Sequence, residues 1–130
     1  MGLYGLAAVG SGAACGAWLR WWLGLRLNPV FPTVPLGTLA ANLLGGLLIG
    51  LAVAYLNRHP ELAPEVRLFA VTGFLGGLTT FSTFSSEVVT LITRGEFAWA
   101  AGAVGVHLGG SLLLTGIGFA IVSAAVRPAL

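Results

Sequence analysis

Hydroxyl side chains are concentrated in one short stretch of the chain. Six of the eight residues from 79 to 86 are Ser or Thr, Gly76 and Gly77 come just before them, and Glu87 follows. Because Gly and Thr both lower helix propensity, the sequence favours a break between Gly76 and Thr80 in the helix that carries this stretch. A break exposes backbone carbonyl oxygens, the hard ligands that alkali cations prefer. The alternative is a continuous helix in which each hydroxyl bonds to a carbonyl of its own helix.

Two aromatic rings lie inside the same stretch. Phe81 and Phe84 are three residues apart, so on a helix they share one face. The edge of an aromatic ring carries partial positive charge, and its face carries partial negative charge. Two rings that present their edges to a narrow path could therefore favour a small anion without a fixed cation on which the anion would stall. The alternative is that this pair only fills a core, and the flanking hydroxyls favour the first interpretation.

Four further polar side chains fall in largely apolar segments: Asn42, Glu87, His107 and Ser111. Asn42 and Ser111 can each donate a hydrogen bond to an anion, or bond to a neighbouring helix, which is worth only about 1 kcal/mol in a membrane. Glu87 and His107 are ionisable, and an ionisable group at membrane depth is a candidate functional residue. The alternatives are a position near the interface for Glu87, which lies seven residues before Arg94, and a neutral imidazole bonded to another helix for His107.

The elements that must hold these residues are membrane helices. Of the 130 residues, 57% are apolar and only 8% are charged, and the mean hydropathy is +0.96. A soluble domain carries about 25% charged residues, so the composition indicates an integral membrane protein. One helical span needs roughly 20 apolar residues, which leaves room for about four spans and for no soluble catalytic domain. The six Arg and four Glu are too few and too scattered for a nucleic-acid-binding face.

The charge-poor stretches predict a single all-α domain covering residues 1–130. The predicted spans are residues 3–25, 36–57, 68–93 and 97–126. The third span is the one expected to break in mid-membrane. Residues 58–67 form the most polar ten-residue window of the chain, which predicts an aqueous turn between the second and third spans. An even number of spans places both termini on the same side of the membrane.

The arginines are shared equally between the two sides. Three lie on the side of the termini and three on the opposite side: Arg58, Arg67 and Arg127 against Arg20, Arg26 and Arg94. Orientation normally follows an excess of positive charge in the cytoplasmic loops. The tie predicts insertion in both orientations, with opposite copies paired about a twofold axis in the membrane plane. The alternative is a single orientation decided by a weak bias.

Glycines four residues apart recur in every predicted span. The chain has 20 glycines, about twice the usual share. The pairs are Gly12 and Gly16, Gly46 and Gly50, Gly73 and Gly77, and Gly105 and Gly109. Small residues at this spacing let helix backbones approach closely in lipid, so the spans are expected to be tightly packed.

Three of these segments together resemble a known family, the small four-span fluoride channels called Fluc or CrcB. The resemblance covers nearly the whole chain. It rests on Gly16–Trp21 (GAWLRW), Gly37–Gly45 (GTLAANLLG) and, most specifically, Gly76–Ser85 (GGLTTFSTFS). It implies a fluoride-selective channel that exports fluoride passively through the cell's inner membrane and protects against fluoride toxicity. It also implies an antiparallel, dual-topology homodimer with two pores, in agreement with the arginine tie.

The resemblance assigns roles to individual residues of this chain. It implies a pore lined by Phe81 and Phe84, with hydrogen bonds from Asn42 and Ser111. The remaining assignments are a polar track of Ser82 and Thr83, a vestibule position for Arg20, and a structural sodium ion at the dimer axis held by the backbone carbonyls of Gly76 and Thr79. His107 is also assigned to the pore, on the wall that the fourth span forms. The family usually has tyrosine at this position, so the resemblance does not define the chemistry of that wall.

Two other functions fit parts of the same sequence. A proton-coupled exporter of the small multidrug-resistance type also has four spans, and Glu87 would be its coupling carboxylate. Such exporters carry their carboxylate in the first span, where this chain has none. An accessory subunit that packs only through its glycine faces is the other alternative. No nucleophile, metal triad or phosphate-binding loop is present in the sequence, so we expect no enzyme.

Overall fold

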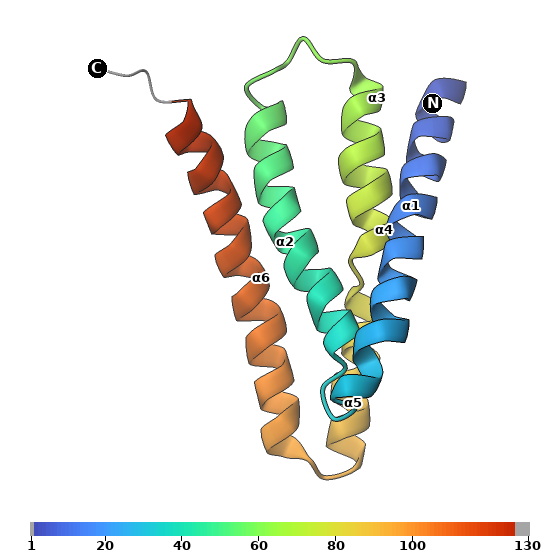
Figure 1. The fold of residues 1–130 in the computed structure, drawn as a ribbon, viewed down its shortest axis with the longest axis vertical. Coiled ribbons are helices and arrows are strands. Elements are labelled where there is room, and N and C mark those ends of the chain that lie inside the picture. Colours follow the sequence, from blue (N-terminus) through green and yellow to red (C-terminus); the bar gives the residue numbers. More distant parts are fainter. Residues whose placement is uncertain (1, 127–130) are drawn as a thin grey trace.

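The computed structural model describes residues 2–126 and is helical throughout, apart from short connections (Figure 1). No β-strand occurs in this part of the chain, which confirms the all-α prediction. The helical elements are α1 (Leu3–Leu27), η1 (Asn28–Val30), α2 (Leu36–Leu56), α3 (Pro64–Arg67), η2 (Leu68–Leu75), α4 (Gly76–Leu78), α5 (Phe81–Thr93) and α6 (Phe97–Ala125). Elements α3, η2, α4 and α5 follow one another as a single composite helix.

The long helices run alternately up and down, and the first turn of α1 lies at the same end as the last turn of α6 (Figure 1). This agrees with the prediction that both termini share a side, although Arg127, which entered the arginine count, lies outside the described residues. Helix α6 packs mainly against α2, whereas α1 packs against η2 and α4. The most enclosed packing centre is formed by Ala41, Leu75 and Leu78, which lie where α2 meets the composite helix.

Among residues 2–126, three helical segments are long and apolar enough to cross a membrane: Leu36–Leu56, Pro64–Thr93 and Phe97–Ala125. They correspond to the second, third and fourth predicted spans. Helix α1 has 25 residues, which is sufficient length for a span. Its glycines, tryptophans and two arginines make it less apolar than the other three, so its position as a span remains a prediction.

The third helix begins earlier than predicted. Residues 64–67 were expected in the aqueous turn, but the helix starts at Pro64, where Ala63 is the N-cap residue. Proline suits the first helical position because its fixed φ matches the helix and its missing N–H has no partner there in any case. Similarly, α1 continues to Leu27 instead of ending at residue 25. The stretch Leu68–Leu75 is a π-helix, which no sequence pattern indicated.

The predicted break of the third helix is confirmed. Thr79 has φ −84° and ψ 153°, and Thr80 has φ −148° and ψ 113°, so two consecutive residues are extended between α4 and α5. The extended pair lies at the C-terminal end of the predicted interval from Gly76 to Thr80. Helix α5 then starts again with Thr80 as its N-cap, and the Thr80 side chain accepts a hydrogen bond from Thr83 N.

Close backbone contact accounts for three of the four glycine pairs. A Cβ on Gly16 would lie 2.7 Å from Leu78 N, and one on Gly46 would lie 2.9 Å from Ser111 O, so both sites exclude a side chain. Gly73 and Gly77 make matching contacts with α1. The fourth pair behaves differently, because Gly105 and Gly109 have nothing within 4 Å of an added Cβ. The expectation of tight packing is therefore wrong for that pair within one protomer.

Candidate functional site

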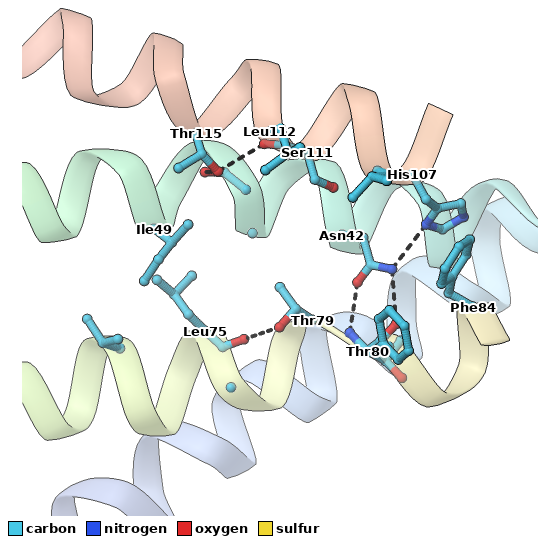
Figure 2. Close-up of a pocket in the computed structure, with 16 residues that line it drawn as sticks. Asn42, Ile49, Leu75, Thr79, Thr80, Phe84, His107, Ser111, Leu112 and Thr115 are labelled. Atoms are coloured by element: carbon cyan, nitrogen blue, oxygen red, sulfur yellow. Dashed lines mark hydrogen bonds between the residues drawn. The ribbon is translucent and has the colours of Figure 1, made fainter. Parts of the chain in front are cut away.

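The break in the composite helix is held open by Asn42 of α2. Thr80 N donates to Asn42 Oδ1 at 2.7 Å, and Asn42 Nδ2 donates to Thr80 O at 3.0 Å (Figure 2). A side-chain amide thus supplies the acceptor that Thr80 N–H loses at the break, and it gives Thr80 O a further donor. Because a buried backbone N–H or C=O needs a partner, this pair of bonds makes two extended residues tolerable inside the bundle.

Backbone donors near the break are diverted from their helical acceptors. In a continuous helix, Gly76 O would accept from Thr80 N, but Thr80 N donates to Asn42. Likewise Thr79 O would accept from Thr83 N, which donates instead to Thr80 Oγ1 at 3.1 Å. The carbonyls of Gly76 and Thr79 are therefore released from the helix ladder, and these are the two carbonyls that the sequence analysis assigned to a cation.

The next carbonyl is satisfied from another helix. Arg20 of α1 donates through Nε to Gly77 O at 3.0 Å. The guanidinium thereby caps the C-terminal end of α4, where a positive charge complements the helix dipole. Arg20 also lines a pocket of about 290 Å³ together with Trp21, Asn28, Thr38, Thr80 and Thr83. We call this the vestibule pocket, and it contains the predicted vestibule residue Arg20 and the predicted track residue Thr83.

A larger hollow of about 460 Å³ shares Thr80 with the vestibule pocket and is also lined by Asn42, and we call it the central pocket. Seven of the residues singled out from the sequence line it: Asn42, Gly76, Thr79, Phe81, Phe84, His107 and Ser111. They come from α2, from both halves of the composite helix and from α6. The structure therefore brings most of the predicted site together, whereas Arg20 and Thr83 belong to the vestibule pocket and Ser82 lines neither.

The two phenylalanines meet edge to face. Their ring centroids are 5.6 Å apart with an interplanar angle of 66°. Phe81 is 80% exposed, so the alternative that it fills the core of its own protomer is wrong. Phe84 is partly buried and lies against His107, with ring centroids 4.6 Å apart. The pair thus extends from the wall of the central pocket to the surface of the protomer.

His107 and Glu87 are each engaged by a neighbouring helix. His107 Nδ1 lies 3.1 Å from Asn42 Nδ2, and His107 Nε2 is buried with no hydrogen-bond partner within residues 2–126. Glu87 accepts a 2.6 Å hydrogen bond from Thr38 Oγ1. The His107 contact is the bond to another helix that was the alternative for this residue. Glu87 also bonds to another helix, and neither Thr38 nor Asn42 carries a charge.

Thr115 is a pocket residue that the sequence analysis did not identify. It lines the central pocket, and its Oγ1 donates to Gly46 O at 2.8 Å and to Ser111 O at 2.9 Å. Its position four residues after Ser111 places it on the same helix face, which is a signal that could have found it. Thr80 was included only as the end of the break, but it contacts Asn42 and lines both pockets.

Comparison with known proteins gives a consistent result. The family described as "CrcB-like protein, Camphor Resistance (CrcB)" matches residues 7–119. The chain is 63% identical over 122 residues to the "Fluoride-specific ion channel FluC" of Nitrosospira multiformis, covering 94% of this chain and 95% of that protein. Proteins of the same name from Cupriavidus metallidurans and Pseudomonas putida are 61% and 58% identical over 118 residues, covering 91% of this chain and 94% and 93% of theirs.

The shared name of these relatives is that of an ion channel, which confirms the prediction that the protein is not an enzyme. The resemblance noted from the GAWLRW, GTLAANLLG and GGLTTFSTFS segments is confirmed as well, since all three lie within the matched residues 7–119. The chain therefore belongs to the Fluc/CrcB family.

Proposed function

We propose that this chain is a fluoride-selective channel that exports fluoride passively. The observation that carries the proposal is the Phe81–Phe84 pair, which stands edge to face at the mouth of a pocket built around a broken helix. The names of relatives that are about 60% identical over nearly the full chain support the same conclusion. The function depends on how the groups that line this pocket stabilise a small anion.

Fluoride is small and strongly hydrated, so a channel must replace its water without binding it too tightly to release it. Ring edges at Phe81 and Phe84 provide weak positive potential, and Ser111 provides a hydroxyl on the opposite wall. None of these groups carries a full charge, so an anion is stabilised along the path without being trapped. Ser82 and Thr83 form the polar track in this proposal, and Arg20 raises the local anion concentration at the vestibule.

Asn42 takes part as a wall of the pore and as the clamp on the break. Both of its amide hydrogens are used, one by Thr80 O and one by His107 Nδ1. For Asn42 to donate to fluoride, one of these bonds must open as the ion passes. The amide is therefore a donor that is available only transiently, which suits a site that must bind weakly.

The functional unit in this proposal is an antiparallel homodimer with two pores. Phe81 is 80% exposed in a single chain, and an exposed aromatic ring at the mouth of the central pocket calls for a covering surface. Gly105 and Gly109 of α6 make no close contact within the protomer, which leaves their side of α6 open for another helix. A twofold axis would cover both features in both copies with a single interface.

A structural sodium ion fits the carbonyls at the break. Gly76 O and Thr79 O have lost their helical donors, and hard oxygen ligands suit an alkali cation. Two copies related by a twofold axis would present four such oxygens to one ion. Bound there, sodium would neutralise the carbonyl dipoles at the centre of the dimer, and its role would be structural.

The direction of flow follows from the chemistry of the ion. Hydrogen fluoride enters a cell as the neutral acid and dissociates inside, so a passive channel in the inner membrane exports the anion down its gradient. In this role the protein protects the cell against fluoride.

The test is fluoride efflux from liposomes that contain the purified protein. We expect rapid release of trapped fluoride, measured with an ion-selective electrode after addition of valinomycin to compensate the charge, and retention of trapped chloride under the same conditions. Phe119→Ile is a matched control for isoleucine substitutions at Phe81 and Phe84, because Phe119 lies on α6 but lines neither pocket. Release of both anions at equal rates, or of neither, would overturn the proposal.

A further inference from the structure

The hydrogen bonds that connect α6 to the helix break pass through His107. Its Nδ1 lies 3.1 Å from Asn42 Nδ2, and Asn42 holds Thr80 through two further bonds of 2.7 Å and 3.0 Å. Figure 2 shows Asn42 placed between the imidazole on one side and the extended backbone on the other. His107 is only 4% exposed, whereas Asn42 and Thr80 are partly buried and line the central pocket with it. The direction of this chain of bonds is decided by which atoms can donate and which can accept.

The orientation of the Asn42 amide is set by Thr80. Thr80 N–H is a backbone donor and can only donate, so the Asn42 atom that faces it must be Oδ1. The other amide atom is then Nδ2, which can only donate, and it faces both Thr80 O and His107 Nδ1. Nδ1 must therefore accept. A histidine whose Nδ1 accepts and which is neutral carries its proton on Nε2.

Nothing at the other ring nitrogen selects this tautomer. His107 Nε2 is buried and has no partner among the described residues, so its proton gains nothing from a neighbour. The opposite tautomer would leave Nε2 equally unpaired and would set Nδ1–H against the Nδ2–H of Asn42. Phe84, which lies against the imidazole, offers a ring face and no hydrogen-bonding atom. Asn42 alone decides where the proton sits.

We propose that His107 is a positioning residue for the helix break and acts through Nδ1 as an acceptor. Its bond to Nδ2 adds to the two Thr80 bonds that hold Asn42 Oδ1 towards Thr80 N–H, and a Thr80 N–H bonded to Asn42 leaves Gly76 O without its helical donor. A side chain on α6 thereby helps to keep a carbonyl on the composite helix free. The inference rests on the proposed function to the extent that the freed Gly76 carbonyl is the one assigned to sodium.

The first test measures the tautomer itself. His59→Gln leaves His107 as the only histidine, and His59 lies in the α2–α3 connection, away from both pockets. Protein labelled with ¹⁵N-histidine and placed in bilayers gives separate NMR signals for protonated and unprotonated ring nitrogens. We expect Nδ1 to be unprotonated and Nε2 to be protonated. A proton on Nδ1, in the neutral or the doubly protonated ring, would overturn the proposal whether or not the protein transports fluoride.

The second test separates the acceptor from the bulk of the ring. His107→Asn keeps an acceptor oxygen where Nδ1 stands, whereas His107→Leu keeps a similar volume against Phe84 and has no acceptor. We expect the sodium concentration that gives half-maximal thermal stabilisation to rise about tenfold in the leucine variant, and to stay within about threefold of the original in the asparagine variant. Equal behaviour of the two variants would reduce His107 to a packing residue and overturn the inference.

The two tests also separate this inference from the proposed function. A wild-type protein with the expected tautomer but without fluoride efflux would contradict the channel proposal and leave the positioning role intact. A wild-type protein with fluoride efflux and a proton on His107 Nδ1 would contradict the positioning role and leave the channel proposal intact.

Discussion

Phe81 and Phe84 lie three residues apart but have different surroundings. Phe84 packs against His107 inside the protomer, whereas Phe81 is 80% exposed. An exposed phenylalanine at the edge of the central pocket adds little to the packing of its own chain beyond its contact with the Phe84 ring. Its ring edge is therefore available to an ion or to a second copy, and the two rings are best tested separately.

Replacing either ring removes the aromatic edge and keeps an apolar side chain. We predict that Phe81→Ile and Phe84→Ile each reduce the rate of fluoride efflux about tenfold. This corresponds to a free-energy barrier for permeation that is higher by about 1.4 kcal/mol. Liposome efflux measures the rate, and size-exclusion chromatography checks that assembly persists. If both variants assemble normally and transport at the original rate, the ring edges have no part in permeation.

At the residue scale, the spacing of residues along one helix predicted which side chains share a face, whereas contacts between helices could not be predicted. The three-residue spacing of Phe81 and Phe84 correctly predicted a shared face, and most of the residues singled out from the sequence do line one pocket. The chain of bonds from His107 through Asn42 to Thr80 was not predictable. It joins residues 65 and 38 positions apart, and it depends on how each helix is rotated about its own axis.

The break is the element on which the site depends. Gly-Gly followed by Thr-Thr predicted it from propensity alone, and the structure places two extended residues there. The earlier start at Pro64 and the π-helix at Leu68–Leu75 were missed. A polar window can hold the first turn of a helix as easily as a turn, because first-turn N–H groups need no helical acceptor. Hydropathy does not record how tightly a helix is wound.

Close packing of α1 on the composite helix keeps the break in place. A Cβ on Gly16 would meet Phe74 O and Leu78 N. We therefore predict that Gly16→Ala lowers the free energy of unfolding by about 1–3 kcal/mol, because two backbones must move apart. Thermal unfolding in detergent, followed by size-exclusion chromatography, measures the loss. Gly116→Ala is the control, since nothing lies within 4 Å of that position; equal stability of the two variants would refute close packing at Gly16.

The freed carbonyls of Gly76 and Thr79 are the proposed ligands of a structural sodium ion. In the proposed dimer, four such oxygens would repel one another without the cation, so we predict that replacing sodium by N-methyl-D-glucamine lowers both thermal stability and fluoride efflux. Restoring sodium should reverse both changes, and an anomalous or ion-substitution diffraction experiment should find one cation on the axis. Full activity and stability in sodium-free buffer would rule out a structural ion there.

The arginines are divided almost equally between the two ends of the molecule. Arg58 and Arg67 lie in the α2–α3 connection and in α3, Arg20 and Arg26 lie in the second half of α1, and Arg94 lies in the α5–α6 connection. With Arg127, which lies outside the described residues, the count is three against three, and this tie is the basis of the dual-topology prediction. The arrangement of two copies is a property of two chains, so it stays a prediction.

Topology can be measured with a single cysteine in the exposed α2–α3 connection. In a Cys15→Ser background, we predict that Glu61→Cys is labelled by a membrane-impermeant maleimide in about half of the molecules in spheroplasts, since no arginine excess sets a direction. Permeabilised spheroplasts give the total. Labelling that is nearly complete or nearly absent before permeabilisation would mean a single orientation.

The molecule as a whole is proposed to conduct fluoride without coupling to protons, and an electrical recording tests this most directly. Purified protein in a planar bilayer, with unequal fluoride on the two sides and equal chloride, should pass a current whose reversal potential follows the fluoride gradient. Imposing a pH gradient should leave that potential unchanged. A reversal potential that moves with pH would point to a proton-coupled exporter, with Glu87 as its carboxylate, and would contradict a passive fluoride channel.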